Sequence, residues 1–199
     1  MKALITTVPF ALKNKLPLDL LNASGIDYVI NPLNKKLTED ELSEMISDYD
    51  VLIAGTEPIS KKVLDYAINL KMISRVGIGL DNVDLLTAQD RGIKVSYTPD
   101  APAPAVAELT IGFIFSLLRS IHVSNSQLHN GNWNRIFGKR IAEVTIGIIG
   151  VGRIGSRVIR RTKPFGTPRI LVNDINPTKN SDLDFKLEWV SKQEIYEKA

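Results

Sequence analysis

The residues best suited to chemistry lie in the segment Ile146–Gly155, an apolar run that ends in Gly-x-Gly-x-x-Gly. Gly150 allows a tight turn out of a strand, Gly152 leaves room for the backbone to approach a ligand, and Gly155 lets a following helix pack closely. The start of such a helix presents N–H groups and positive dipole charge to an anion. The spacing therefore predicts a pyrophosphate-binding loop.

A carboxylate follows this loop at the distance that is typical of a dinucleotide-binding site. A second apolar run, Ile170–Asn173, ends in Asp174, 19 positions after Gly155. Asp174 would accept hydrogen bonds from the ribose hydroxyls of an adenosine and repel a 2′-phosphate, so we expect NAD to be preferred over NADP. Lys179 is near enough in sequence to soften that repulsion. A glycine-rich turn without a ligand is the alternative, and the ordered combination of strand, glycines, helix and carboxylate disfavours it.

Length and composition limit the remaining possibilities. The chain has 199 residues, of which 44% are hydrophobic and 24% charged, as in globular proteins of one large or two small domains. It has no cysteine, which excludes a disulfide framework and a thiol nucleophile, and we expect a cytoplasmic protein. The net charge of +3 comes without a basic stripe, so we expect no nucleic-acid partner. The longest apolar stretch, Ala105–Leu118, contains Glu108 and is too short to span a membrane, so none is expected.

The two histidines, His122 and His129, are the only candidates for a nitrogen-ligated metal. They lie seven residues apart with no nearby carboxylate pair. Because that is not a metal-ligand spacing, we expect no metal site and interpret both as surface residues.

The first half of the chain is predicted to consist of alternating strands and helices. We expect strands at 3–5, 28–30, 51–54, 72–75 and 94–97, and helices at 16–23, 38–46, 60–66 and from 82 or 84 to about 90. Thr38 followed by Glu41 fits a capping box at the second helix. This alternation is typical of a parallel sheet, and it predicts a flavodoxin-like domain over residues 1–98.

A proline-rich segment, residues 98–104, separates the domains, because its three prolines cannot continue a strand or sit inside a helix. The second domain, 99–199, comprises a long helix at about 101–120, an arm at about 121–142 and a glycine-motif part at about 144–199. The helix is apolar on nearly every face, so we expect it to be buried all round. The irregular arm, with Trp133 and Phe137, either packs against a neighbour or forms a long loop.

The last part of the chain contains fewer elements than a complete nucleotide-binding fold. After Val144 we expect one strand, one helix, a second strand and then a helix over 189–199, with Ser191 as its cap and Glu194 three residues later. A Rossmann domain has two βαβαβ halves, and the third strand of the first half would follow Ala199. The sequence therefore predicts an incomplete Rossmann domain.

The order of the motifs resembles the D-isomer-specific 2-hydroxyacid dehydrogenases, most closely the phosphoglycerate dehydrogenase branch. The resemblance covers the whole chain, and four segments in the family's order carry it. These are Arg75–Asp84 as the substrate loop, Thr98-Pro99 with Val106-Ala107-Glu108 as the interdomain crossing, Gly131-Asn132-Trp133, and Gly150–Gly155 with Asp174 as the cofactor fingerprint.

The resemblance implies two α/β domains with an active-site cleft between them, and hydride transfer between C2 of a D-2-hydroxy acid and the nicotinamide of NAD. It implies that backbone N–H groups of Gly77, Ile78 and Gly79 bind the substrate carboxylate, for which glycines can form an anion-binding nest. An ordinary strand-to-helix turn is the alternative reading of that loop. Ile78 replaces the threonine common in phosphoglycerate dehydrogenases, which weakens a phosphoglycerate assignment. The 3-phosphoglycerate, glycerate/hydroxypyruvate and glyoxylate classes therefore stay open.

The resemblance also implies the cofactor contacts. Ile78 and Val106 would lie near the nicotinamide, and Val151, Arg153 and Ile154 would meet the pyrophosphate and the adenosine ribose, largely through their backbone.

The family's catalytic groups, an Arg, a Glu and a His, are expected beyond Ala199. We assign no catalytic residue in this chain and expect no useful dehydrogenase activity from it alone. The complete protein is expected to be a homodimer formed through the long helix and the arm. Two alternatives remain: a non-catalytic dinucleotide-binding or regulatory, corepressor-like protein, and an inactive fragment.

Overall fold

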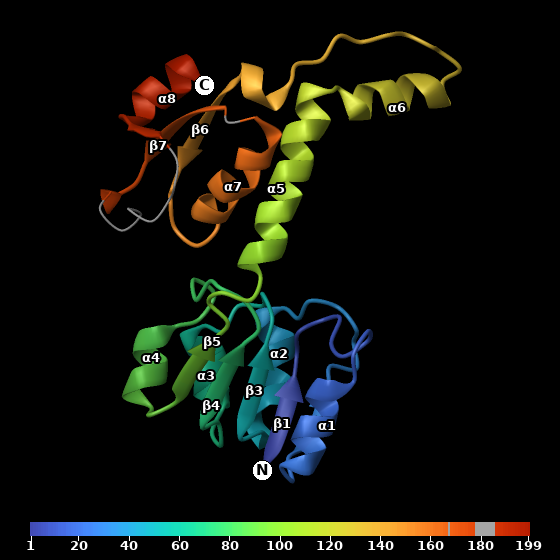
Figure 1. The fold of residues 1–199 in the computed structure, drawn as a ribbon. Helices are drawn as coiled ribbons and strands as arrows, with labels where there is room; N and C mark the ends of the chain where they lie inside the picture. Colours follow the sequence, from blue (N-terminus) through green and yellow to red (C-terminus); the bar gives the residue numbers. More distant parts are fainter. Residues whose placement is uncertain (167, 178–185) are drawn as a thin grey trace. The chain divides into compact units, whose positions relative to one another are not determined.

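The computed structural model describes residues 1–166, 168–177 and 186–199 (Figure 1). The chain divides into two compact units, unit 1 over Met1–Ala101 and unit 2 over Pro102–Ala199. The division falls inside the proline-rich segment, slightly after the predicted boundary at residue 98. Lys179, predicted to soften the charge of Asp174, lies outside the described residues.

Unit 1 contains a five-stranded sheet in the order β2-β1-β3-β4-β5, and every pairing is parallel. Its strands are β1 (Lys2–Ile5), β2 (Asp27–Ile30), β3 (Val51–Ala54), β4 (Met72–Arg75) and β5 (Lys94–Tyr97). This is the strand order of the flavodoxin-like fold, and it confirms the fold predicted from the alternating pattern.

Four α-helices connect these strands: α1 (Leu16–Ala23), α2 (Glu39–Met45), α3 (Lys61–Tyr66) and α4 (Leu85–Asp90). The predicted capping box of α2 is present, with the Thr38 side chain accepting from Glu41 N–H and the Glu41 carboxylate accepting from Thr38 N–H. Since βαβ crossovers are right-handed, this strand order puts α1 on one face of the sheet and α2, α3 and α4 on the other. The main core of unit 1 includes Leu4, Leu52 and Ile73 of the central strands.

Unit 2 contains a smaller parallel sheet in the order β6-β7-β8. Its strands are β6 (Thr145–Ile149), β7 (Arg169–Asn173) and β8 (Leu187–Trp189), and its α-helices are α5 (Ala103–Leu118), α6 (Ile121–His129), α7 (Gly155–Thr162) and α8 (Lys192–Lys198). Helices α5 and α7 pack side by side, as Figure 1 also shows. Their apolar residues share a core with Ile148, Ile170 and Val172 of the sheet.

Strand β8 corrects the prediction for the end of the chain. We predicted a helix from Trp189 and no third strand before Ala199, whereas Leu187–Trp189 pairs in parallel with Ile170–Val172 of β7. Three residues with a central Glu188 carry no recognisable strand pattern, and β8 is stabilised by its neighbour rather than by its own composition.

The predictions for the long helix and the arm were wrong in two respects. Helix α5 is buried only at Ala103, Ala107 and Ile111, and Phe113 is 60% exposed, because α7 covers one side of it. The arm, predicted to be irregular, contains α6, which is separated from α5 by Ser120 with a positive φ of 50°. Serine, asparagine and histidine have low helix propensity, and α6 is rich in them, so the sequence did not predict this helix.

The described residues contain no single helix that is long and apolar enough to cross a membrane. Helices α5 and α6 reach the necessary length and composition only as a pair, with a bend of 64° between them.

Helix α8 covers the face of the small sheet at Gly147. A Cβ added there would lie 2.4 Å from Ile195 Cγ2 and 2.8 Å from Ala199 Cβ, so only glycine lets the helix approach this closely. Ile195 is the one buried residue of α8.

Replacing Ile195 with alanine should therefore destabilise unit 2. We expect Ile195→Ala to lower the free energy of unfolding by about 2–4 kcal/mol, since it removes a buried side chain and leaves a cavity. The matched control is Tyr196→Ala on the same helix, where the side chain is 69% exposed and the expected change is below about 0.5 kcal/mol. Urea unfolding followed by tryptophan fluorescence measures this, because Trp133 and Trp189 both belong to unit 2. Equal losses for the two variants would contradict the packing described.

Candidate functional site

The loop after β6 has the geometry that the glycine motif predicted. Gly150 has a φ of +94°, which favours glycine, and its N–H donates to Asn173 O at 2.8 Å, so the turn is attached to the end of β7. A Cβ at Gly155 would lie 2.0 Å from Gly150 O, so the first residue of α7 must lack a side chain. The protein's own turn and packing therefore explain both of these glycines.

Gly152 is different, because nothing in the structure requires it to be glycine. A Cβ added at Gly152 would have no heavy atom within 4 Å, and the residue has no positive φ. Gly152 thus has open space beside it, three residues before the start of α7, the helix end that suits an anion. The residues present thus fit a dinucleotide. Gly152 is the glycine of this loop that a bound ligand would require and that the folded chain does not.

Asp174 lies beside this loop, immediately after β7. Its Oδ2 accepts a hydrogen bond from Val151 N–H at 2.6 Å, and its Oδ1 accepts one from Asn176 N–H at 2.8 Å. These bonds fix the carboxylate at the glycine-rich loop. A carboxylate oxygen can accept more than one hydrogen bond, which is the capacity that ribose hydroxyls would require of Asp174.

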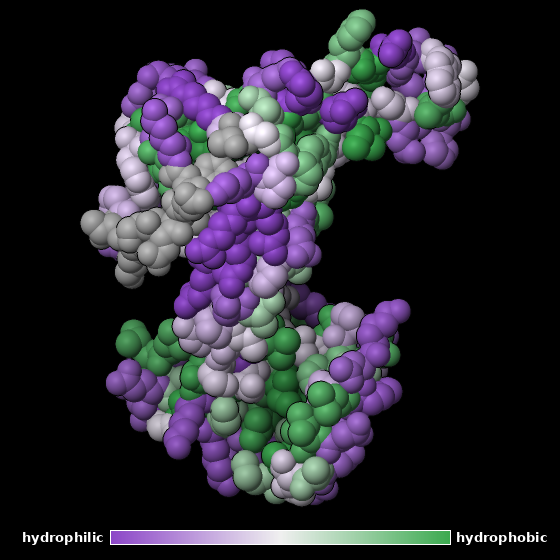
Figure 2. Space-filling model, viewed as in Figure 1, coloured by the Kyte–Doolittle hydropathy of each residue, from purple (hydrophilic) through white to green (hydrophobic). Residues whose placement is uncertain are grey.

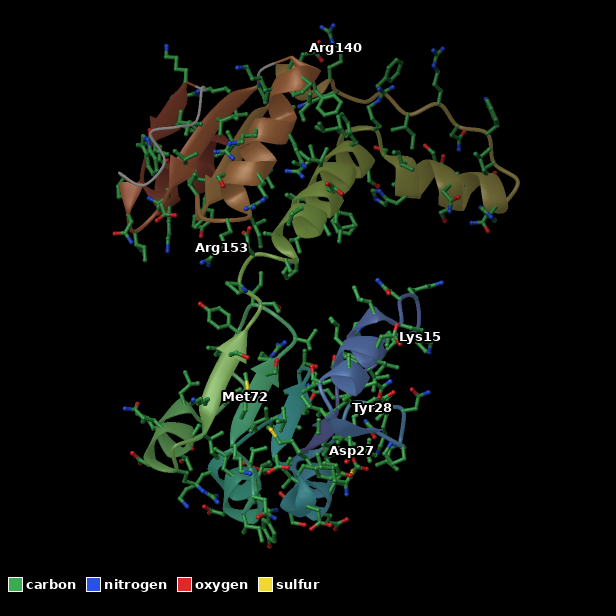
Figure 3. The ribbon with its side chains drawn as sticks, turned by 60° about the horizontal axis from the view of Figure 1, so that its bottom comes forward. Lys15, Asp27, Tyr28, Met72, Arg140 and Arg153 are labelled. Carbon is green, nitrogen blue, oxygen red and sulfur yellow. The ribbon has the colours of Figure 1, made fainter. Side chains whose placement is uncertain are left out.

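Helix α7 adds positive charge next to the loop. It carries Arg157, Arg160 and Arg161, and Figure 2 shows the hydrophilic surface over this helix. Arg153 lies in the loop between β6 and α7, at the edge of unit 2 in Figure 3, and its carbonyl accepts from Arg157 Nη1 at 2.7 Å. Arg161 is paired with Glu108 of α5 at 3.0 Å. Arg157 belongs to the first turn of α7, next to the loop, whereas Arg160 and Arg161 belong to its last turn, where they complement the helix dipole.

The other predicted cofactor contacts divide between the two units. Ile154 packs against the core of unit 2 that includes Val151 and Ala107, and Val106 is the neighbour of Ala107 on α5. Ile78 belongs to unit 1, so its predicted role near the nicotinamide stays a prediction.

The predicted substrate loop follows β4 in unit 1. Val76 N–H donates to Ala54 O at 2.8 Å, and Gly77 N–H donates to Arg75 O at 3.1 Å. Within the described chain, the N–H groups of Ile78 and Gly79 have no hydrogen-bond acceptor. Of the three N–H groups predicted to bind a carboxylate, that of Gly77 is therefore already used, and those of Ile78 and Gly79 are available.

The buried guanidinium of Arg75 is hydrogen-bonded to the backbone of this loop. Arg75 is 8% exposed, its Nη1 donates to Val76 O at 2.5 Å, and a Cβ on Gly77 would lie 1.9 Å from the same nitrogen. Arg75 Nε donates to Asn82 Oδ1 at 3.3 Å, and Asn82 Nδ2 donates to Glu57 O at 2.7 Å. This network connects the loop after β4 with the loop after β3.

A cavity of about 110 Å³ lies next to that network. Its lining residues are Thr6, Thr7, Val8, Lys36, Gly55, Thr56, Glu57 and Val76. Reasoning from the sequence missed Glu57, which is 2% exposed and accepts from Gly55 N–H at 2.9 and 3.2 Å as well as from the Thr6 hydroxyl. The signal was available, because Thr6 and Gly55-Thr56-Glu57 directly follow the neighbouring strands β1 and β3, at the edge where ligands bind in open α/β sheets.

Electrostatic effects elsewhere are local. At the start of α4, the N–H and hydroxyl of Thr87 donate to Asp84 and hold the pKa of its carboxyl below the usual range.

A larger hollow of about 480 Å³ lies in unit 2, between α6 and residues 132–136. Among the described residues that line it, Arg135 is the only charged one, so the hollow offers few groups for catalysis.

A family model for the catalytic domain of D-isomer-specific 2-hydroxyacid dehydrogenases matches residues 11–198. The chain belongs to this family. The 2-hydroxyacid dehydrogenases are oxidoreductases, and the membership confirms the resemblance read from the motifs.

Individual relatives agree with this assignment. The chain is 34% identical over 169 residues to the hydroxypyruvate reductase of Thermotoga maritima, covering 83% of this chain and 54% of the relative. It is 42% identical over 134 residues to the D-3-phosphoglycerate dehydrogenase of Methanocaldococcus jannaschii, covering 65% of this chain and 25% of that protein. The crystal structure of the NAD-dependent formate dehydrogenase of Staphylococcus aureus in complex with NAD matches with a TM-score of 0.77 and 26% identity, covering 98% of this chain and 62% of that one. The chain thus spans about half the length, or less, of the curated relatives it matches.

Gly155 and Gly152 should respond differently to substitution. Gly155→Ala should lower the free energy of unfolding of unit 2 by about 1–3 kcal/mol, because the new methyl group overlaps a backbone oxygen. Gly152→Ala should change it by less than about 0.5 kcal/mol, because the methyl group enters open space. Urea unfolding followed by tryptophan fluorescence tests the pair, and a Gly152→Ala variant as unstable as Gly155→Ala would show that Gly152 serves the fold.

Proposed function

We propose that this chain forms the substrate-binding domain and the first part of the cofactor domain of an NAD-dependent D-2-hydroxyacid dehydrogenase. The observation that carries the proposal is the open space at Gly152, beside the start of α7 and next to Asp174. A glycine that neither the turn nor the packing requires, at the site where a pyrophosphate would bind, is best explained by the ligand.

Each part of the site has a task in this proposal. The loop around Gly152 and the start of α7 bind the pyrophosphate, and Asp174 accepts from the adenosine ribose. The N–H groups of Ile78 and Gly79 bind the substrate carboxylate, with the charge of Arg75 beneath them. Bound NAD supplies the acceptor for the hydride from C2. Proton transfer and stabilisation of the C2 oxygen fall to the Arg, Glu and His that the family resemblance implies.

The names of the relatives support the substrate class. They include hydroxypyruvate reductase, glyoxylate reductase/hydroxypyruvate reductase and D-3-phosphoglycerate dehydrogenase. The substrate of this protein in our proposal is accordingly a short D-2-hydroxy acid or the matching 2-oxo acid, of the 3-phosphoglycerate, glycerate/hydroxypyruvate or glyoxylate class.

Nucleotide binding by the 199-residue chain tests the cofactor site. We expect NADH to bind at least about ten-fold more tightly than NADPH, because the Asp174 carboxylate repels a 2′-phosphate, and Asp174→Asn should reduce this ratio. Gly152→Ala should weaken NADH by about ten-fold or more, because its methyl group occupies the space of the pyrophosphate. Enhancement of NADH fluorescence on binding measures the affinities.

The matched control is Gly112→Ala, which places a methyl group in open space on α5 of the same unit and should leave NADH affinity unchanged. Equal affinities for NADH and NADPH in the unmodified chain would refute the role of Asp174. NADH binding that tolerates Gly152→Ala would refute the proposed position of the pyrophosphate.

We also propose that the complete protein is a homodimer formed through α5 and the arm. The supporting observation is an apolar surface of unit 2 that the described residues of the chain do not cover. It consists of Leu109, Phe113 and Leu117 on α5 together with Trp133 and Phe137, the last 94% exposed. Exposed large apolar side chains, three of them spaced four residues apart along α5, are typical of an interface between subunits.

Sedimentation equilibrium tests this association. The unmodified chain should show a mass near twice 22.1 kDa, and Phe113→Asp should shift it towards the monomer, because a charge at a subunit interface opposes association. Leu12→Asp is the matched control, since Leu12 is an exposed apolar residue of unit 1. If the unmodified 199-residue chain is a monomer, the proposed dimer does not form from this chain alone.

A further inference from the structure

The cavity in unit 1 adjoins the loop that is proposed to bind the substrate carboxylate. Val76 lines the cavity and immediately precedes Gly77-Ile78-Gly79, and its N–H is fixed to Ala54 O at the end of β3. A short acid whose carboxylate is bound by Ile78 and Gly79 N–H groups therefore has the cavity beside it. The natural occupant of the cavity is the substituent that the acid carries on C3.

The wall of this cavity contains a buried acidic side chain. Glu57 is 2% exposed, and its carboxylate is bound by Gly55 N–H and the Thr6 hydroxyl. None of the cations in the described part of the chain forms an ion pair with it. The hydrogen bonds to Glu57 come from neutral groups, so they hold its position without cancelling its charge.

Two buried charged residues belong to this part of unit 1, and only one of them lines the cavity. Arg75 is not a lining residue, and its Nη1 is bonded to Val76 O beside Gly77, where it favours a carboxylate, whereas Glu57 lines the cavity and opposes one. Lys36 also lines the cavity, but its side chain is exposed, so water and salt screen its charge. A buried charge acts through a lower effective dielectric constant than an exposed one, so Glu57 should dominate within the cavity.

We propose that Glu57 is a specificity-determining residue that excludes acids with a negatively charged C3 substituent. The cavity then takes an uncharged substituent such as a hydroxyl, and the preferred substrates are of the glycerate/hydroxypyruvate class rather than phosphorylated acids. A phosphate in this position would lose much of its hydration beside a fixed carboxylate, which is an effective way to reject a competing substrate. This inference rests on the proposed function, because it assumes a carboxylate bound at Ile78 and Gly79.

Chemical-shift titration of the 15N-labelled 199-residue chain tests the proposal without requiring catalysis. The ligands are D-glycerate and 3-phospho-D-glycerate at the same ionic strength. The Ile78 and Gly79 amides report carboxylate binding, and the Gly55 amide reports occupation of the cavity. We expect glycerate to bind at least about ten-fold more tightly than phosphoglycerate, because the added charge enters a poorly screened site.

The decisive variant is Glu57→Gln, which removes the charge and keeps the shape. Its amide oxygen can still accept from Gly55 N–H, and its NH2 group can donate to Thr6 Oγ1 while Thr6 donates to Ile53 O. The affinity for phosphoglycerate should rise by about ten-fold or more, with that for glycerate changed by less than about two-fold. Glu44→Gln is the matched control, because it makes the same charge change on an exposed residue of α2 and should leave the ratio unaltered.

Three results would overturn the proposal, and they are distinguishable. If the ratio of the glycerate affinity to the phosphoglycerate affinity is the same in the unmodified chain and in Glu57→Gln, Glu57 does not determine specificity. A preference for phosphoglycerate that disappears in Lys36→Met would make Lys36 the selecting residue instead. If neither ligand shifts the Ile78 and Gly79 amides, the carboxylate site itself fails, and with it the proposed function of this loop.

A second measurement needs no variant and covers the case in which Glu57→Gln fails to fold. The unmodified chain is titrated with D-2-hydroxybutyrate and D-malate, which place an uncharged methyl group and a carboxylate on C3. We expect hydroxybutyrate to bind more tightly by about five-fold or more, because the carboxylate of malate meets the same repulsion as a phosphate. Equal binding of the two acids would overturn the proposal.

Discussion

The close approach of Gly155 to the carbonyl oxygen of Gly150 is the constraint on which the nucleotide site depends. It allows the first residue of α7 to pack against the turn that follows β6, so the positive end of the helix faces the turn rather than a side chain. Because β7 is the parallel neighbour of β6, the residue that follows it, Asp174, reaches Val151 N–H at 2.6 Å. One backbone contact and one strand pairing thus bring together the glycine-rich loop and the Asp174 carboxylate, the groups that we propose bind the pyrophosphate and the ribose.

The same property of parallel sheets brings together the loops that we propose bind the substrate in unit 1. The loops that follow β1, β3 and β4 meet at one edge because these strands are neighbours. Thr6, Glu57 and Arg75 are far apart in sequence, and hydrogen bonds through Asn82 and Gly55 connect their segments. Arg75 is buried beside the loop that follows β4, and Glu57 is buried in the wall of the cavity, so residues of opposite charge type lie near the proposed carboxylate site.

Local patterns were sufficient for most elements of the fold. The five strands of unit 1, the cap of α2 and the glycine-rich turn were predicted because apolar periodicity, capping residues and glycine spacing act over a few residues. Strand β8, helix α6 and the exposed side of α5 were not predicted. The strand and the exposed side of α5 depend on partners distant in sequence, because β7 pairs with β8 and α7 covers only one side of α5. Helix α6 was missed because its residues have low helix propensity.

The sequence by itself determined the family, the parallel α/β fold and the positions of Gly150, Gly152, Gly155 and Asp174, since a motif of fixed spacing is readable wherever it occurs. Only the tertiary structure distinguished the tasks of the three glycines, because φ values and steric overlap are properties of the folded backbone. Only the tertiary structure showed that Gly77 N–H is already bonded, and that Glu57 lines a cavity beside the carboxylate loop. The physical reason is that hydrogen-bond occupancy, burial and the screening of charge depend on which segments the sheet brings together, and the strand order decides this.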